Sequence, residues 1–296
     1  MRMRNVPRFF LMAAVTAASC WHLSAQEVKF RTIPKEVVEG RLRDCPEKSA
    51  QRWRKLEEWF KAAGGGDSLS EQPVSGYPDP NVICTLRGES DSTIIVGAHF
   101  DNGGWGHGVI DNWSGAALLP TLYESLKVVP RKHTFIFVGF AAEEEGLKGS
   151  SFYARHMTRE EVARTRALVN LDCLGLGTTA VLTLSSDKML MDMLVRVAGA
   201  LKLRLGMGNL QGARWDADSF SGKIPKITLH SITVRKGNVA NSFSDNWDEV
   251  RWDEYYNSYL LAAAYLAHID GQLKEERAPS RFAERASGQA QPAFFK

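Results

Sequence analysis

The sequence has little of several features that identify common classes of protein. Its 296 residues include only four cysteines, and no two of them are spaced as C-x-x-C. The absence of that spacing argues against a structural zinc site built from cysteines. The formal net charge is only +3, with Lys and Arg scattered along the chain, so a dedicated nucleic-acid surface is not expected. No G-x-S-x-G motif supports a serine hydrolase.

A long apolar run is also missing. The longest, FFLMAAVTAASCWHL, is shorter than the ~20 apolar residues of a membrane span, so no stable membrane association is expected. It follows the basic segment MRMRNVPR and precedes a possible cleavage site at residues 23–25. We predict a signal peptide over residues 1–25 and export to the periplasm or the extracellular space, with an uncleaved anchor as the alternative. Lipoprotein anchoring through Cys20 is not expected, because Ala17 replaces the usual leucine.

Removal of the leader would leave three cysteines, Cys45, Cys84 and Cys173. An odd count permits one disulfide and leaves one thiol. A Cys45–Cys84 pair is the more plausible bridge, because Cys173 directly follows a candidate metal ligand. Three buried thiols are an equally good interpretation.

Apolar patterning predicts helices that alternate with strands. Residues 34–63 have helical spacing, and strands at 81–87 and 93–98 are joined by a link short enough for a hairpin. Further helices are expected at 114–127, from 150, at 189–201 and at 252–269, and further strands at 134–140, 167–171, 180–184 and 224–232. This order predicts an α/β three-layer sandwich with a mixed, mostly parallel sheet flanked by helices. One domain would span residues 26–273, followed by a flexible tail at 274–296.

Acidic residues and a histidine follow several of the predicted strands. His99 ends one strand, Asp101 and Asp111 come shortly after it, and Glu143-Glu144 and Asp172 end two others. In such sheets, sites form at the carboxyl ends of the strands. Imidazole and carboxylate oxygens suit zinc, and the adjacent carboxylates would repel one another without a cation. A solvated acidic loop capping the next helix is the alternative for the glutamates.

Four segments in order resemble the motifs of the M28 metallopeptidases, the co-catalytic zinc aminopeptidase family. They are GAHFD, GVIDNWSGA, FAAEEEGLKGS and NLDCLG, within a stretch from Val82 to Leu266. The resemblance implies a zinc-peptidase/phosphorylase-hydrolase-like fold. It also implies an aminopeptidase that hydrolyses the N-terminal bonds of peptides or proteins with metal-activated water, and the predicted signal peptide would make it an exported one.

The resemblance also implies a role for each matching residue. Two zinc ions per chain are expected, with one as a possibility. Asp101 would orient His99 through its ring N–H. The implied ligands and base are His99 and Asp172 on one zinc, Asp111 bridging, Glu144 on the other zinc, and Glu143 as general base.

One motif departs from the family pattern. Asn241 stands where the family has a late histidine, and an amide oxygen is a poor ligand for zinc. His230, at the end of a predicted strand, or His107 could replace it, although each is better explained as a residue without a metal role, His230 as a strand-end histidine and His107 as an exposed loop residue. The departure keeps two alternatives open, a glutaminyl-cyclase-like single-zinc acyltransferase and a non-catalytic M28-like binding protein.

Three further residues are candidates for substrate binding. Trp113, together with Trp105, could wall a pocket for an apolar side chain, although core packing explains them as well. Asp218 belongs to a segment that resembles the family's loop near the substrate side chain, and it could meet an amino group. Asn241 itself could contact substrate in place of a metal.

Overall fold

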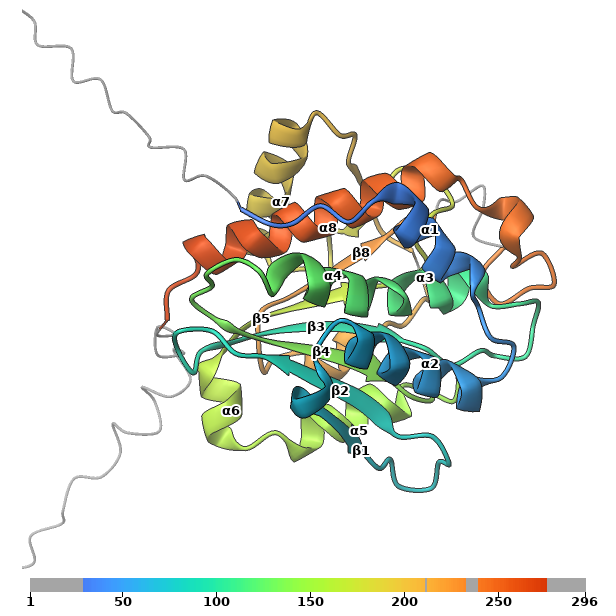
Figure 1. Cartoon of the computed structure of the whole chain (residues 1–296), viewed down its shortest axis with the longest axis horizontal. Coiled ribbons are helices and arrows are strands. Elements are labelled where there is room, and N and C mark those ends of the chain that lie inside the picture. Colours follow the sequence, from blue (N-terminus) through green and yellow to red (C-terminus); the bar gives the residue numbers. More distant parts are fainter. Residues whose placement is uncertain (1–28, 211, 233–238, 276–296) are drawn as a thin grey trace, which may run out of the picture.

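An eight-stranded sheet forms the centre of the protein in the computed structural model, which describes residues 29–210, 212–232 and 239–275 (Figure 1). The predicted signal peptide and residues 276–296 of the predicted tail lie outside the described residues. The strand order is β1-β2-β4-β3-β5-β8-β6-β7, and β4, β3, β5 and β8 are mutually parallel. The strands are β1 (Leu69–Gln72), β2 (Asn81–Leu86), β3 (Thr93–His99), β4 (Thr134–Phe140), β5 (Thr165–Leu171), β6 (Ala180–Leu182), β7 (Gly206–Gly208) and β8 (Lys226–His230).

Helices cover both faces of the sheet and complete the three layers that the sequence predicts. Figure 1 shows α1, α2, α4, α7 and α8 on one side and α5 and α6 on the other. The helices are α1 (Lys35–Arg43), α2 (Ser49–Ala62), α3 (Ser114–Ala116), α4 (Leu118–Leu126), α5 (Lys148–His156), α6 (Arg159–Arg164), α7 (Lys188–Leu201) and α8 (Trp252–Gln272). Within the described residues no helix combines the length and the apolar character that crossing a membrane requires.

The central strands are buried on both faces, because successive side chains point into different cores. Ile94 and Val96 of β3 belong to the larger core beneath α4 and α8, whereas Ile95 belongs to the smaller core beneath α5. In β4, Phe137 and Val138 divide in the same way. This two-sided burial explains why these strands read as continuous apolar runs.

The single helix expected over residues 34–63 is wrong, since α1 ends at Arg43 and α2 begins at Ser49. Pro46 lies in the break. Proline has no backbone N–H to donate and disfavours the helical conformation of the residue before it, so the helical spacing continues through a segment that cannot remain helical.

The hairpin expected between the strands now called β2 and β3 is also wrong. β4 lies between them, antiparallel to β2 and parallel to β3. The short link after β2 bonds to the segment that enters β4: the backbone N–H groups of Glu89 and Ser90 donate to the carbonyls of Arg131 and Lys132 at 3.0 and 2.8 Å. The link between β2 and β3 therefore passes over the end of β4, which is inserted between them.

The Cys45–Cys84 disulfide does not form, because Cys45, Cys84 and Cys173 are free thiols. Cys84 is buried on β2. The Cys45 Sγ instead lies 3.3 Å from a guanidinium nitrogen of Arg52. Burial raises the pKa of the Cys45 thiol to about 11. The alternative of three thiols is confirmed, with Cys84 and Cys173 buried and Cys45 partly buried.

Candidate metal centre

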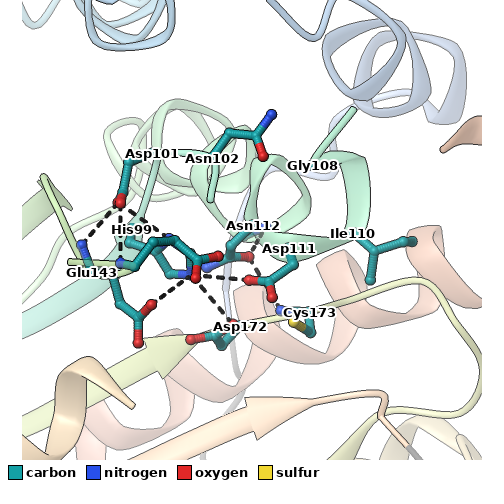
Figure 2. Close-up of polar contacts among 12 residues, drawn as sticks. His99, Asp101, Asn102, Gly108, Ile110, Asp111, Asn112, Glu143, Asp172 and Cys173 are labelled. Atoms are coloured by element: carbon teal, nitrogen blue, oxygen red, sulfur yellow. Dashed lines mark hydrogen bonds and ion pairs between the residues drawn. The ribbon is translucent and has the colours of Figure 1, made fainter. Parts of the chain in front are cut away.

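His99 is the hub of a buried polar cluster at the carboxyl ends of the central strands. Its Nε2 atom lies 3.2 Å from a carboxylate oxygen of Asp111, 3.7 Å from Asp172 and 4.0 Å from Glu143. Figure 2 shows all three carboxylates directed toward the ring. Ligand atoms of His99, Asp111 and Asp172 lie within 4.8 Å of one another, so these residues could share a metal ion.

Asp101 connects this histidine to the loop after β4. One of its carboxylate oxygens lies 3.3 Å from His99 Nδ1. The same carboxylate accepts hydrogen bonds from the backbone N–H groups of Glu143 and Glu144 at 3.0 and 3.1 Å. A single buried side chain thus lies against the imidazole and fixes the backbone of both glutamates.

Asp111 is positioned by two residues that the sequence reasoning did not assign. The Asp245 carboxylate accepts from the backbone N–H groups of Ile110 and Asp111 at 2.7 and 2.9 Å. The Asn112 side chain donates to the carbonyl of Leu171 at 2.9 Å, which ties the loop to the end of β5. Asp245 is the last residue of the segment 241–245, NSFSD, which contains Asn241. Its position in this family motif is the feature of the sequence that could have identified it as a site residue.

The charges of the cluster do not balance without a cation. Burial raises the pKa of Glu143 to about 9 and that of Glu144 to about 7, with nearby carboxylates adding to the effect. Burial lowers the pKa of His99, but Glu143 and Asp172 outweigh it and raise that pKa overall. Across the described residues, the ion pairs of Asp111, Glu143 and Asp172 are all made with His99. Oxygen and imidazole donors with excess negative charge fit a divalent metal.

Asp216 is a further acidic residue beside the cluster, and the sequence reasoning missed it. Its side chain is fully buried, and neither oxygen has a hydrogen-bond partner within the described residues. Burial raises its pKa to about 7, Asp172 contributes to the rise, and His99 opposes it. The residue of the same segment that the sequence predicts to contact substrate is Asp218. The Asp218 carboxylate forms a 2.9 Å ion pair with Lys226 and accepts a hydrogen bond from the backbone N–H of Trp215 at 3.1 Å.

Of the remaining candidate residues, Asn241 lies at the cluster and His230 lies apart from the cavity. Asn241 lies beside Glu144, since a Cβ on Gly103 would be 2.9 Å from the Asn241 Oδ1 atom and 3.0 Å from the Glu144 carboxyl carbon. His230 is buried against Trp215, with 5.5 Å between the ring centroids, and burial lowers its pKa to about 4. Both of its ring nitrogens lack a hydrogen-bond partner within the described residues.

Trp113 and His107 are bound into the surrounding structure. Trp113 is fully buried, donates from its indole nitrogen to the Arg41 carbonyl at 3.1 Å, and packs against Trp59. For Trp113, these contacts agree with the alternative that it packs in the core and does not line a substrate pocket. The His107 ring lies 4.7 Å from the Trp247 ring.

A cavity of about 910 Å³ opens above the cluster. Its acidic end contains His99 and the carboxylates of Asp111, Glu143, Glu144 and Asp172. Apolar side chains form much of the remaining wall: Leu147, Leu210, Trp215, Ile232 and Ala240. Asn241 and Arg214 also line it, whereas His230, Trp113 and Asp218 are not among its lining residues. The arrangement suits a ligand with a cationic and an apolar part.

Comparison with known proteins agrees with the segments that carry the resemblance. Residues 81–265 match peptidase family M28. Aminopeptidase YwaD of Bacillus subtilis is 38% identical over 106 residues, which cover 36% of this chain and 22% of that protein. Aminopeptidase Y of Saccharomyces cerevisiae is 36% identical over 96 residues, covering 32% and 18%. The matched stretch thus spans about a fifth of the length of these relatives.

Solved structures share the fold more extensively. LapA aminopeptidase of Legionella pneumophila superposes with a TM-score of 0.71 at 20% identity, covering 81% of this chain and 71% of that chain. A glutaminyl cyclase from an Acidobacteriales bacterium gives 0.70 at 16% identity, covering 84% and 100%. At these identities the likeness concerns the fold, and it confirms the predicted class. Because the family match covers more than half of its length, this chain belongs to peptidase family M28.

Proposed function

We propose that the protein is an exported zinc-dependent aminopeptidase that hydrolyses the N-terminal bonds of peptides or proteins. The observation that carries the proposal is the buried group of His99, Asp111 and Asp172 with Glu143 and Glu144 on the adjoining loop. The acidic end of the cavity favours a cationic substrate group such as a free N-terminal ammonium. The leader-like N-terminus, which lies outside the described residues, supports export to the periplasm or the extracellular space.

The proposed ligand set is the one that the family resemblance implies, and the grouping of His99, Asp111 and Asp172 supports part of it. His99 and Asp172 would hold one zinc ion and Asp111 would bridge, while Glu144 would hold a second ion beside Asn241. Zinc supplies a Lewis acid that polarises a carbonyl oxygen and makes water nucleophilic at neutral pH. Asp101, held by two backbone N–H groups, keeps the His99 ring oriented. His230 would need a change of position to join the set, because it does not line the cavity.

Glu143 would be the general base. Its carboxylate borders the cluster 4.0 Å from His99 Nε2, and its backbone is fixed through Asp101. The side chain takes a proton from the attacking water and delivers it to the leaving amine. A nearby cation favours the ionised carboxylate, which counteracts the raised pKa of the metal-free state.

The proposal is tested by replacing Glu143 with alanine. Hydrolysis of aminoacyl-arylamides should fall by about 10²–10⁴-fold, the typical contribution of general acid–base catalysis. Zinc content should stay nearly unchanged. Glu145→Ala is the matched control, because Glu145 is an exposed neighbour that pairs only weakly with Lys148 at 3.6 Å. Retained activity in Glu143→Ala would remove Glu143 from the role of base.

A second candidate is a single-zinc glutaminyl cyclase. Asn241 favours it, because one metal position lacks its usual imidazole and the fold matches a bacterial glutaminyl cyclase. Such an enzyme would join the N-terminal amine of a glutaminyl peptide to its own side-chain carbonyl and release ammonia. Measuring pyroglutamate formation beside arylamide cleavage separates the two activities. Purified protein without any zinc would instead support the non-catalytic binding protein.

A further inference from the structure

Two exposed aromatic side chains lie in contact with each other near the cavity. Trp105 is 52% exposed and Phe243 is 76% exposed, and their ring centroids are 5.4 Å apart in an edge-to-face arrangement. They are the aromatic members of the set of exposed large apolar residues in the described chain; the others are aliphatic or methionine. Two aromatic rings that remain this exposed form an apolar patch on the described part of the chain.

The two loops that carry these rings pack tightly on each other. A Cβ on Gly106 would lie 2.5 Å from the carbonyl oxygen of Ser242, so only glycine permits this approach. The His107 N–H donates to the carbonyl of Asp245 at 2.8 Å. The aromatic pair therefore stands on a rigid base that also positions Asp111 through Asp245.

Both rings belong to loops that reach the cavity next to Glu144 and Asn241. Trp105 is two residues beyond Gly103, which faces Glu144 and Asn241, and Phe243 is two residues beyond Asn241, which lines the cavity. Neither aromatic residue is among those that line the cavity itself. An aminopeptidase holds the N-terminal residue of its substrate inside, so the remainder of the peptide must leave across the rim.

We propose that Trp105 and Phe243 form a subsite for an apolar side chain at the second residue of the substrate peptide. This inference rests on the proposed peptidase function. The edge of one ring and the face of the other offer the geometry that aromatic side chains prefer, and a leucine or phenylalanine side chain would cover both. The protein would then favour peptides whose first two residues are both apolar.

The test compares two tripeptides, Leu-Phe-Gly and Leu-Gly-Gly, which differ only at the second residue. The zinc-loaded enzyme should show a kcat/KM for Leu-Phe-Gly at least about 10-fold higher, in the range typical of an added apolar group. In the double variant Trp105→Ala/Phe243→Ala this ratio should fall to within about 2-fold of unity. The ratio is independent of the fraction of folded enzyme. Val128→Ala, which changes an apolar residue that is 51% exposed after α4, should keep the wild-type ratio.

A binding measurement separates this subsite from the proposed activity. Calorimetric titration of the Glu143→Ala protein with the same tripeptides should show the same preference without turnover. If Leu-Phe-Gly binds preferentially but the wild-type protein does not hydrolyse it, the subsite is supported and the proposed peptidase activity is contradicted. Equal kcat/KM values for both peptides, or a preference that survives in the double variant, would overturn the subsite. Loss of self-association in the double variant with an unchanged ratio would assign the pair to contacts between copies and would also overturn it.

Discussion

Asn241 occupies a position where the candidate site departs from the family pattern. Its backbone has φ = 53°, in the left-handed region that asparagine tolerates better than most residues. Its amide oxygen and the Glu144 carboxyl group both face Gly103, so the two side chains border the same space. The side of the site that contains Glu144 thus has one strong ligand and one weak one.

Replacing Asn241 with histidine should strengthen the second metal position. Histidine also tolerates a positive φ, and its imidazole is a far better zinc ligand than an amide oxygen. We expect zinc affinity at the weaker site to rise by at least about 10-fold, by analogy with the effect of single ligand-shell changes. Zinc titration followed by calorimetry, with Asn246→His as the control, measures it. An unchanged second binding step would show that residue 241 does not adjoin a metal.

The loop between β4 and α5 is the element that presents the two glutamates. Asn81 on β2 accepts from the Ala141 N–H at 2.9 Å and donates to the Gly149 carbonyl at 3.0 Å, which closes the base of the loop. Ala142 and Leu147 within it have φ values of 56° and 61°. The surrounding contacts hold these left-handed positions; the one at Ala142 directly precedes the two glutamates, and the one at Leu147 directly precedes α5.

Gly149→Ala should therefore destabilise the protein. The new Cβ would lie 2.2 Å from the Ala141 carbonyl oxygen and 2.4 Å from Asn81 Oδ1, so the loop must shift. Overpacking of this kind costs about 1–3 kcal/mol. Urea denaturation measures the loss. Gly199→Ala is the matched control, because Gly199 lies in α7 with no atom within 4 Å of an added Cβ, and alanine there should stabilise by about 0.5–1 kcal/mol. Equal stability of both variants would contradict this account.

At the scale of the whole molecule, the buried acidic cluster makes stability depend on pH and on metal. The pKa values of Glu143, Glu144 and Asp216 are raised by burial to about 9, 7 and 7. Below about pH 3 these groups are largely protonated in the folded and the unfolded chain alike. As pH rises, the unfolded chain ionises first, so the folded state holds more protons and loses stability toward pH 9.

We expect the melting temperature of the metal-free protein to fall between pH 5 and pH 8.5. Each 1 kcal/mol lost should lower it by about 2–4 °C for a chain of this size. Zinc-loaded protein should show a smaller fall, because the cation stabilises the ionised carboxylates and binds only the folded chain. Differential scanning calorimetry at several pH values, with and without a chelator, measures both curves. Parallel curves would mean that the cluster does not hold the metal.

The sequence alone determined the central strands and most residues of the cluster. Apolar runs marked the central strands because these are buried on both faces, and β4 was predicted with its observed bounds. The strand-end positions brought His99, Asp111, Glu143 and Asp172 together, because parallel strands share one edge. These features depend on local periodicity and chain order, which one sequence contains.

Only the tertiary structure decided features that depend on contacts between distant segments. The insertion of β4 between β2 and β3 arises from pairing across the sheet, which a short link does not reveal. Asp216 and Asp218 are two residues apart with the same side chain, yet one is buried beside the cluster and the other pairs with Lys226. Their difference arises from which side of a single helical turn faces the sheet, and packing alone determines that orientation.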